Sequence, residues 1–353
     1  MSERTPEAGE RPAPFAELTP AAVLDALDGV GLRGDGRLIQ LNSYENRVYQ
    51  AFLEDGRVVV TKFYRPERWN DAQVLEEHAF AAELAGAEIP VAAPWPLDVD
   101  RGSPHAAAVK KVGVTLASAA IGGHDYRFGV CERRAGRAPE LDDPDVLRWL
   151  GRFIGRMHAV GARALFSERL TIDVASYGEA SRAFLLDNEI VSPDSSAAWL
   201  GLVDASLAAC RAAFDAAPPR SLRLHGDCHL GNVLWTQAGP HFVDLDDAVN
   251  GPAIQDLWML LSGNRAEMTR QLYDVLEGYE SFIDFDAGEL RLVEPLRTLR
   301  MVHHSAWIAR RWRDPAFPIA FPWFASPSYW ADQCTRLREQ LEAMAEPALG
   351  SPY

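Results

Sequence analysis

Lysine is scarce in this sequence of 353 residues. The chain contains three lysines, Lys62, Lys110 and Lys111, against 32 arginines, and its formal net charge is −15. Because non-specific binding to nucleic acid depends on accumulated positive charge, we expect no nucleic-acid partner. With so few lysines available, a lysine that stands in an apolar segment is a candidate for a chemical role.

Cysteines and long apolar runs are also few. The four cysteines form no CxxC pair, which argues against a zinc site or a disulfide framework and fits a reducing compartment. No run approaches the roughly 18 uninterrupted apolar residues of a membrane span, and the N-terminal segment lacks the apolar core of a signal peptide. We therefore expect a soluble, cytoplasmic protein with no membrane partner.

The first third of the chain has the pattern of an antiparallel sheet. Apolar residues alternate through residues 37–64, with a hairpin turn expected at Asp55-Gly56. Helical spacing predicts a helix over residues 71–85, which the proline-rich segment 89–99 ends before a further extended stretch. Strands are expected to continue through residues 106–123.

Helical periodicity is expected to take over after Gly122-Gly123 and to dominate the rest of the chain. The sequence thus predicts an α+β protein with a small antiparallel-sheet lobe and a larger, mainly helical lobe, joined near residues 117–123. The expected division is an N-terminal arm and helix (1–30), a small lobe (31–120) and a large lobe (121–353).

The stretch "RLHGDCHLGNVLW" gathers many polar groups between apolar flanks. With the following "HFVDLDDA" it predicts a short hairpin that brings Asp227, Asn232 and Asp244 toward one point. One carboxylate could accept a proton from a hydroxyl, while an amide oxygen and a second carboxylate suit a hard cation such as Mg²⁺. Phosphoryl transfer uses such parts, because it asks the protein mainly for positioning and charge neutralisation.

Lys62 ends the apolar strand "VVVTKFY". An ammonium group without a partner would be costly there, so an acidic residue on the following helix, Glu77 or its neighbour Glu76, is its expected partner. The lysine is a candidate for holding the phosphates of a nucleotide.

These motifs resemble those of the aminoglycoside phosphotransferase and choline kinase superfamily, which is related to the protein kinases. The segments "LNSYENRVYQ", "KFYRPERW", "FVDLDDAVNGPAIQDLWMLL" and "RRWRDPAFP" are similar to a bacterial branch of Ser/Thr protein kinases that act in stress responses. The resemblance covers roughly residues 17–345 and implies a bilobal, protein-kinase-like fold.

The resemblance also implies roles for particular residues. Asp227 would be the catalytic base, Asn232 and Asp244 would bind Mg²⁺, and Lys62, anchored by Glu77, would orient the phosphates of ATP. Ser43, in the turn "NSYEN", would cover those phosphates where protein kinases have a glycine-rich loop, whose GxGxxG pattern this chain lacks. Asp244, as a metal ligand, would be essential to catalysis together with Asp227.

Implied partners are ATP and proteins that carry the accepting Ser or Thr, with autophosphorylation, and the expected oligomeric state is a monomer. Two alternatives stay open: a kinase of a small hydroxylated substrate such as an amino alcohol or aminoglycoside, and a non-catalytic nucleotide-binding regulator. A metal-dependent hydrolase would need His225 and His229 as ligands and would give Lys62 no task. We expect both histidines to be structural, and Asp256 to anchor the catalytic loop or cap its helix.

Overall fold

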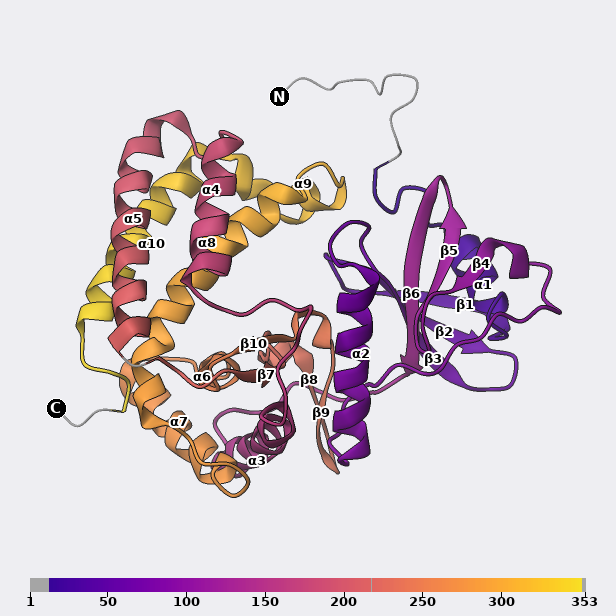
Figure 1. Cartoon of the computed structure of the whole chain (residues 1–353), viewed down its shortest axis with the longest axis horizontal. Helices are drawn as coiled ribbons and strands as arrows, with labels where there is room; N and C mark the ends of the chain where they lie inside the picture. Colours follow the sequence, from indigo (N-terminus) through magenta and orange to yellow (C-terminus); the bar gives the residue numbers. More distant parts are fainter. Residues whose placement is uncertain (1–12, 217, 351–353) are drawn as a thin grey trace. The chain divides into compact units, whose positions relative to one another are not determined.

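The computed structural model describes residues 13–216 and 218–350, and the chain divides into two compact units (Figure 1). Unit 1 comprises Met1–His78, Ala93–Arg133 and Arg313–Ala316. Unit 2 comprises Ala79–Ala92, Arg134–Trp312 and Phe317–Tyr353. The expected N-terminal arm lies mostly outside the described residues.

Unit 1 is built on a six-stranded antiparallel sheet with the strand order β1-β2-β3-β6-β5-β4. Its strands are β1 (Gly34–Leu41), β2 (Arg47–Leu53), β3 (Val58–Phe63), β4 (Val109–Lys111), β5 (Ala117–Ile121) and β6 (His124–Glu132). Helix α1 (Pro20–Asp28) begins at Thr19, whose side chain accepts a hydrogen bond from the N–H of Ala22. Val23 and Leu27 of α1 pack in one core cluster with apolar side chains of the sheet.

The first part of the chain folds largely as its pattern predicts. Gly56, at φ 86°, lies in the turn between β2 and β3, and α2 (Asp71–Gly86) matches the predicted helix. The prediction that helices take over after Gly122-Gly123 is wrong, because these glycines, at φ 55° and 79°, form the turn of the β5–β6 hairpin. The sheet therefore continues through β6, and segment 89–99 contributes only isolated bridges such as Pro94 with Cys131.

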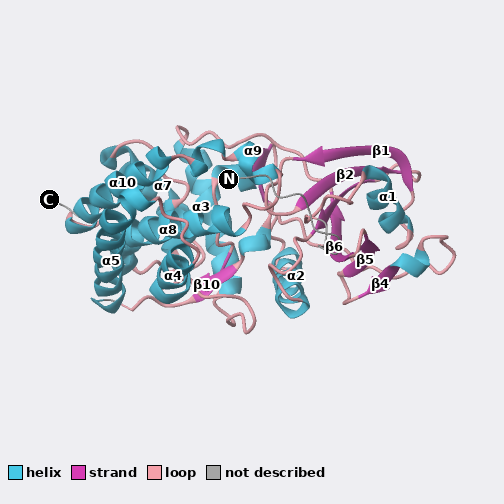
Figure 2. Cartoon of the chain, turned by 90° about the horizontal axis from the view of Figure 1, so that it is seen from above, coloured by secondary structure: helices cyan, strands magenta, loops and turns pink. Residues whose placement is uncertain are grey.

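Unit 2 is mainly helical, as Figure 2 shows by secondary structure. Besides the end of α2, its helices are α3 (Pro144–Gly161), α4 (Ala180–Asp187), α5 (Pro193–Ala216), α6 (Ile254–Trp258), α7 (Arg265–Tyr279), α8 (Val293–Arg310), α9 (Ala316–Ala320) and α10 (Pro327–Ala345). Helices α3 and α7 touch backbone to backbone, because a Cβ on Gly151 or Gly278 would collide with main-chain atoms of the other helix. Two short antiparallel pairs complete the unit: β7 (Leu222–Leu224) with β10 (Val249–Gly251), and the hairpin of β8 (Val233–Thr236) with β9 (Gly239–Phe242).

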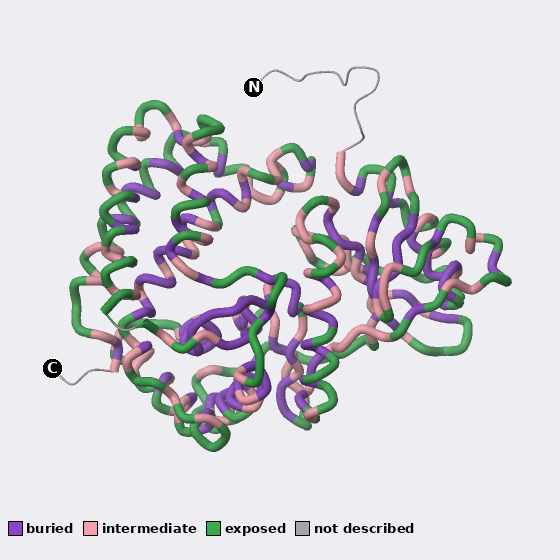
Figure 3. The backbone as a smooth tube through the Cα atoms, in the orientation of Figure 1, coloured by how far each residue is buried: buried purple, intermediate pink, exposed green. Residues whose placement is uncertain are grey.

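Helix α5 is the one described helix that is long and apolar enough, by length and composition alone, to cross a membrane. Its side chains Trp199, Val203 and Leu207 are buried in a core cluster that also contains residues of α8 and α10. Figure 3 shows that buried positions recur along the helices of unit 2. The same composition is typical of a core helix.

A buried carboxylate lies at the start of α6. Oε2 of Glu289, which is 3% exposed, accepts a hydrogen bond of 2.9 Å from the N–H of Ile254. Burial, assisted by the charge of Asp286, raises the pKa of Glu289 from 4.5 to about 7. Between about pH 5 and 6.5 the folded protein therefore holds a proton that the unfolded chain has largely released.

This pKa shift predicts a pH dependence of stability. Between about pH 4.5 and 7 the free energy of unfolding should fall as the pH rises, by up to about 3 kcal/mol from this group, because the folded state binds the extra proton. Glu289→Gln keeps an oxygen that can accept from Ile254 and should remove this part of the slope. Urea unfolding of both proteins at pH 5 and pH 7.5 measures the change in the free energy of unfolding between the two pH values. The same change in both proteins would contradict the pKa shift.

Candidate active site

The loop that carries Asp227 is fixed by Asp256, a fully buried residue of α6. Its Oδ2 accepts a hydrogen bond of 2.8 Å from the N–H of His225, and its Oδ1 accepts one of 2.8 Å from the N–H of Gly226. His158 of α3 contacts the same carboxylate through Nε2 at 3.0 Å. The prediction that Asp256 anchors this loop is confirmed.

Gly226 allows the loop to turn sharply before Asp227. Its φ is 83°, in the left-handed region, and a Cβ at this position would collide with the carbonyl oxygen of Asp247. Any larger residue would therefore push Asp227 away from the segment that follows Asp244.

Asp227 lies between two basic side chains of unit 2. Its Oδ2 is 3.5 Å from Nε2 of His229, and its Oδ1 is 2.8 Å from Nη1 of Arg300, which comes from α8. Nδ1 of His229 accepts a hydrogen bond of 2.9 Å from the N–H of Gly231, so the proton of a neutral ring sits on Nε2 and faces Asp227.

The pKa of Asp227 reflects this environment. Burial raises it, but the hydrogen bond from His229 and the charges of Arg300, His229 and His225 outweigh burial, and the net shift is downward. Asp227 is therefore a carboxylate at neutral pH, which is the form that can accept a proton.

The β8–β9 hairpin joins this loop to Asn232 and Asp244. Nε2 of His225 and the carbonyl oxygen of Val243 are 2.9 Å apart, and the N–H of Val243 donates to the carbonyl oxygen of Asn232 at 3.0 Å. The side-chain Nδ2 of Asn232 donates to the carbonyl oxygen of Asp227 at 2.9 Å. This bond fixes the orientation of the amide, and its Oδ1 is an oxygen of the type that binds a hard cation.

Asp244 follows β9 with φ 61° and ψ 61°, a left-handed conformation that is uncommon outside glycine. Such conformations concentrate at functional sites. Across residues 13–216 and 218–350 no group of three His, Cys, Asp or Glu is arranged to hold a metal. One carboxylate and one amide oxygen nevertheless fit Mg²⁺, which proteins commonly bind with few ligands and leave partly to phosphates and water.

The predicted nucleotide residues lie in unit 1. Lys62 is on β3, where it pairs in register with Val48 and Gly129, and its Nζ is 5.9 Å from the centre of the Tyr64 ring. On α2, Glu77 is 5% exposed and Glu76 is half-buried. Burial favours Glu77 as the residue that needs a cationic partner, and its pairing with Lys62 stays a prediction.

Ser43 lies in the turn between β1 and β2, as predicted. Arg65 holds this turn: its Nε donates to the carbonyl oxygen of Glu45 at 2.9 Å and its Nη2 to that of Tyr44 at 3.2 Å. Sequence reasoning missed Arg65, although it stands in the segment "KFYRPERW", and it also missed Arg300, which no local pattern marks. The role of Ser43 toward phosphates stays a prediction.

The fold and the loop with its hairpin define a class of protein. The model of the phosphotransferase enzyme family matches residues 37–293. The chain belongs to this family and is therefore a phosphotransferase. Within the family it groups with the proteins that are named stress response kinase A.

Two relatives support the grouping with the stress response kinases. Stress response kinase A of Escherichia coli (strain K12) is 45% identical over 335 residues, covering 95% of this chain and 96% of that protein. The Serine/threonine protein kinase RdoA of Salmonella typhimurium (strain LT2) is 44% identical over 337 residues, with the same coverage of 95% and 96%.

Solved structures share the fold at low identity. The microcompartment-associated aminopropanol kinase has a TM-score of 0.65 at 17% identity, over 92% of this chain and 98% of that one. The amicoumacin kinase hAmiN, solved with AMP-PNP and Ca²⁺, has a TM-score of 0.63 at 20% identity, over 88% and 89%. The predicted α+β, kinase-like fold class is confirmed.

The anchoring of the loop can be tested with Asp256→Asn. An amide offers one acceptor oxygen in place of two, so a buried N–H of His225 or Gly226 would lose its partner, and the free energy of unfolding should fall by about 2 kcal/mol. Urea unfolding measures this change. An exposed control on the same unit, Asp215→Asn, should leave stability unchanged, and an unchanged Asp256→Asn protein would contradict the anchoring role.

Proposed function

We propose that this protein transfers the γ-phosphoryl group of ATP to Ser and Thr hydroxyls of proteins, including its own, as a cytoplasmic, monomeric kinase of a bacterial stress response. The hydroxyl oxygen bonds to the γ-phosphorus, and the bond between that phosphorus and the leaving oxygen of ADP breaks. Asp227 accepts the proton of the hydroxyl.

The environment of Asp227 is the observation that carries this proposal. A general base must be deprotonated and held in place, and the low pKa of Asp227 and the anchoring of its loop by Asp256 meet both conditions. His225 and His229 support the loop and the carboxylate through hydrogen bonds, so a hydrolase with these histidines as metal ligands is not favoured.

Asn232 and Asp244 would hold Mg²⁺, which supplies positive charge to the phosphates when bound. The bond from Asn232 Nδ2 to Asp227 supports this assignment, since it turns the amide oxygen toward the cation. Lys62 would neutralise phosphate charge and Glu77 would orient Lys62, while the turn of Ser43 would cover the phosphates. A chain that keeps base, metal and lysine positions is a poor candidate for a non-catalytic regulator.

A kinase of small hydroxylated substrates is the second candidate. The solved neighbours described as aminopropanol and amicoumacin kinases favour it by their names. The relatives at 44–45% identity, one of which is named a Serine/threonine protein kinase, favour proteins as acceptors. Incubation with labelled ATP and Mg²⁺, with a protein substrate or with amino alcohols and aminoglycosides, separates the two.

Two variants test the site, because both should lose phosphate transfer but only one should lose affinity for Mg²⁺-ATP. Asp227→Asn keeps the shape but removes the charge that accepts the proton, so phosphate transfer should fall about 10²- to 10⁴-fold while nucleotide affinity stays near that of the wild type. Asp244→Ala removes a metal ligand, so transfer should be lost and the affinity for Mg²⁺-ATP should fall as well. Calorimetry with Mg²⁺-ATP and transfer assays on the same preparations measure both quantities.

The outcomes that would overturn these roles are distinct. Asp227→Asn with lost nucleotide binding would make Asp227 a metal or structural residue. Asp244→Ala with unchanged transfer would remove Asp244 from the metal site. A matched control, Asp246→Asn, should bind Mg²⁺-ATP like the wild type if Asp244 is the ligand on this segment.

A further inference from the structure

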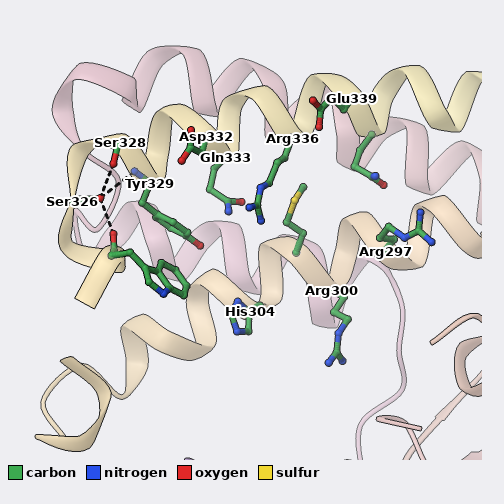
Figure 4. Close-up of a pocket in the computed structure, with 13 residues that line it drawn as sticks. Arg297, Arg300, His304, Ser326, Ser328, Tyr329, Asp332, Gln333, Arg336 and Glu339 are labelled. Carbon is green, nitrogen blue, oxygen red and sulfur yellow. Dashed lines mark hydrogen bonds between the residues drawn. The ribbon is translucent and has the colours of Figure 1, made fainter. Parts of the chain in front are cut away.

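A pocket of about 800 Å³ lies in unit 2 between α8 and α10 (Figure 4). Arg300 and Met301 of α8 line one side, and Gln333 and Arg336 of α10 line the other, with Trp323 also contributing. Arg300 is the residue that contacts Asp227 at 2.8 Å. The pocket is thus continuous with the side chain that touches the proposed catalytic base.

Gln333 contributes a polar side chain to the wall of the pocket. The residue is 4% exposed as a whole, and within the described part of the chain its amide makes no hydrogen bond to protein. Its amide atoms are not among the fully buried polar atoms, so they are accessible from the pocket. Figure 4 shows the Gln333 amide pointing from α10 toward α8, where it can donate or accept a hydrogen bond.

Arg336 is also turned into the pocket. Asp332 and Glu339 stand four residues before and three residues after it, the spacing at which helical ion pairs form. Neither lies within ion-pair distance of Arg336 in the described structure. Figure 4 shows the guanidinium directed toward α8, and Asp332 and Glu339 also line the pocket.

The third pocket arginine is already neutralised. Nη1 of Arg297 lies 3.0 Å from Oε1 of Glu294. Arg300 is also paired, with Asp227 at 2.8 Å, so Arg336 and the amide of Gln333 are the pocket donors without a carboxylate partner among the described residues. Such donors bind carboxylate or phosphate oxygens, and a ligand carboxylate would compete with Asp227 for Arg300.

The length of the pocket favours a peptide. Its lining on α10 extends from Ser326 to Gln340, about 20 Å at 1.5 Å per residue. An extended peptide of about six residues has that length, and a small amino alcohol does not. The exposed ring of Trp323 adds an apolar contact surface.

We propose that Gln333, Arg336 and Arg300 bind an acidic side chain that flanks the accepting Ser or Thr of a peptide. The proposal rests on the proposed function and names its acceptor class. A carboxylate held at Arg300 would also draw this arginine from Asp227, so that the base becomes accessible to the neighbouring hydroxyl. A cationic aminoglycoside would meet the wrong charge at this point.

Steady-state phosphorylation of three matched Ser peptides, flanked by Asp, Asn or Lys, tests the proposal. The wild type should have the lowest KM for the Asp peptide. Arg336→Gln should raise that KM roughly tenfold or more, because a charge-assisted hydrogen bond is lost, and should leave the KM of the Asn peptide unchanged. Arg338→Gln, two residues along α10 and outside the pocket, is the matched control and should behave like the wild type.

Each other outcome contradicts the proposal in its own way. Equal use of the Asp and Asn peptides, or preference for the Lys peptide, would overturn acidic recognition. Use of a small phosphorylated or carboxylated alcohol in place of any peptide would overturn the peptide acceptor. Autophosphorylation is measured alongside: its presence with no peptide use refutes this inference alone, while its absence together with lost transfer to every acceptor refutes the proposed function.

A second inference rests on a buried ionic cluster in unit 1. Asp314 is 3% exposed and accepts from Nη2 of Arg65 at 2.7 Å and Nη2 of Arg47 at 3.3 Å. Arg65 in turn donates to the carbonyl oxygens of Tyr44 and Glu45 in the turn of Ser43. Asp314 belongs to the short segment Arg313–Ala316, which is part of unit 1 although it follows the rest of that unit by about 180 residues in the chain.

We infer that Asp314 is a positioning residue for the nucleotide, because it fixes Arg65 and thereby the turn that would cover the phosphates. Asp314→Asn should raise the KM for ATP several-fold and leave the KM of the acceptor unchanged. Since buried arginines without a partner are costly, Arg65→Lys is the second variant: it keeps the charge opposite Asp314 but cannot donate to both carbonyls, and should raise the same KM.

The control is Asp35→Asn, which breaks an exposed ion pair with Arg37 in the same unit. It should leave the KM for ATP unchanged. A lower melting temperature with an unchanged KM for ATP in both Asp314→Asn and Arg65→Lys would make the cluster purely structural and overturn the inference.

Discussion

The carboxylate of Asp256 is the constraint on which the loop that carries Asp227 depends. It accepts hydrogen bonds from two successive N–H groups, those of His225 and Gly226, and it contacts His158 of another helix. A buried carboxylate is costly unless it is fully bonded, so the same bonds that satisfy Asp256 hold the loop in one conformation. The position of Asp227 follows directly from these bonds.

The hairpin extends this constraint to Asn232 and Asp244, the proposed metal ligands. Asn232 donates to the backbone of Asp227, and the N–H of Val243 donates to Asn232. Asp244 is held in a left-handed conformation directly after this point. Asp227, Asn232 and Asp244 thus lie in or next to one hydrogen-bonded network. The bonds of the neighbouring residues hold Asp244 in its left-handed conformation.

The sequence predicted local features well and long-range partners poorly. The HGD loop, its hairpin and the anchoring role of Asp256 follow from short motifs, because nearby residues determine their geometry. Gly122-Gly123 was misjudged, since a glycine pair can end a sheet or form a hairpin turn with equal ease, and only pairing with β6 decides between them. Arg300 has no local pattern in the sequence, because its contact with Asp227 depends on how α8 packs against the loop.

Three arginines of the described chain have structural roles that suit a guanidinium. Arg65, Arg169 and Arg223 are each less than 10% exposed and each donates to several oxygens at once. A guanidinium suits such buried, multiple bonds, whereas a lysine ammonium is a compact charge that is strongly hydrated. Lys110 and Lys111 are exposed, and Lys62 alone is a half-buried lysine. A half-buried lysine in such a fold is a candidate for a specific role, and the contact of Lys62 with phosphates stays a prediction.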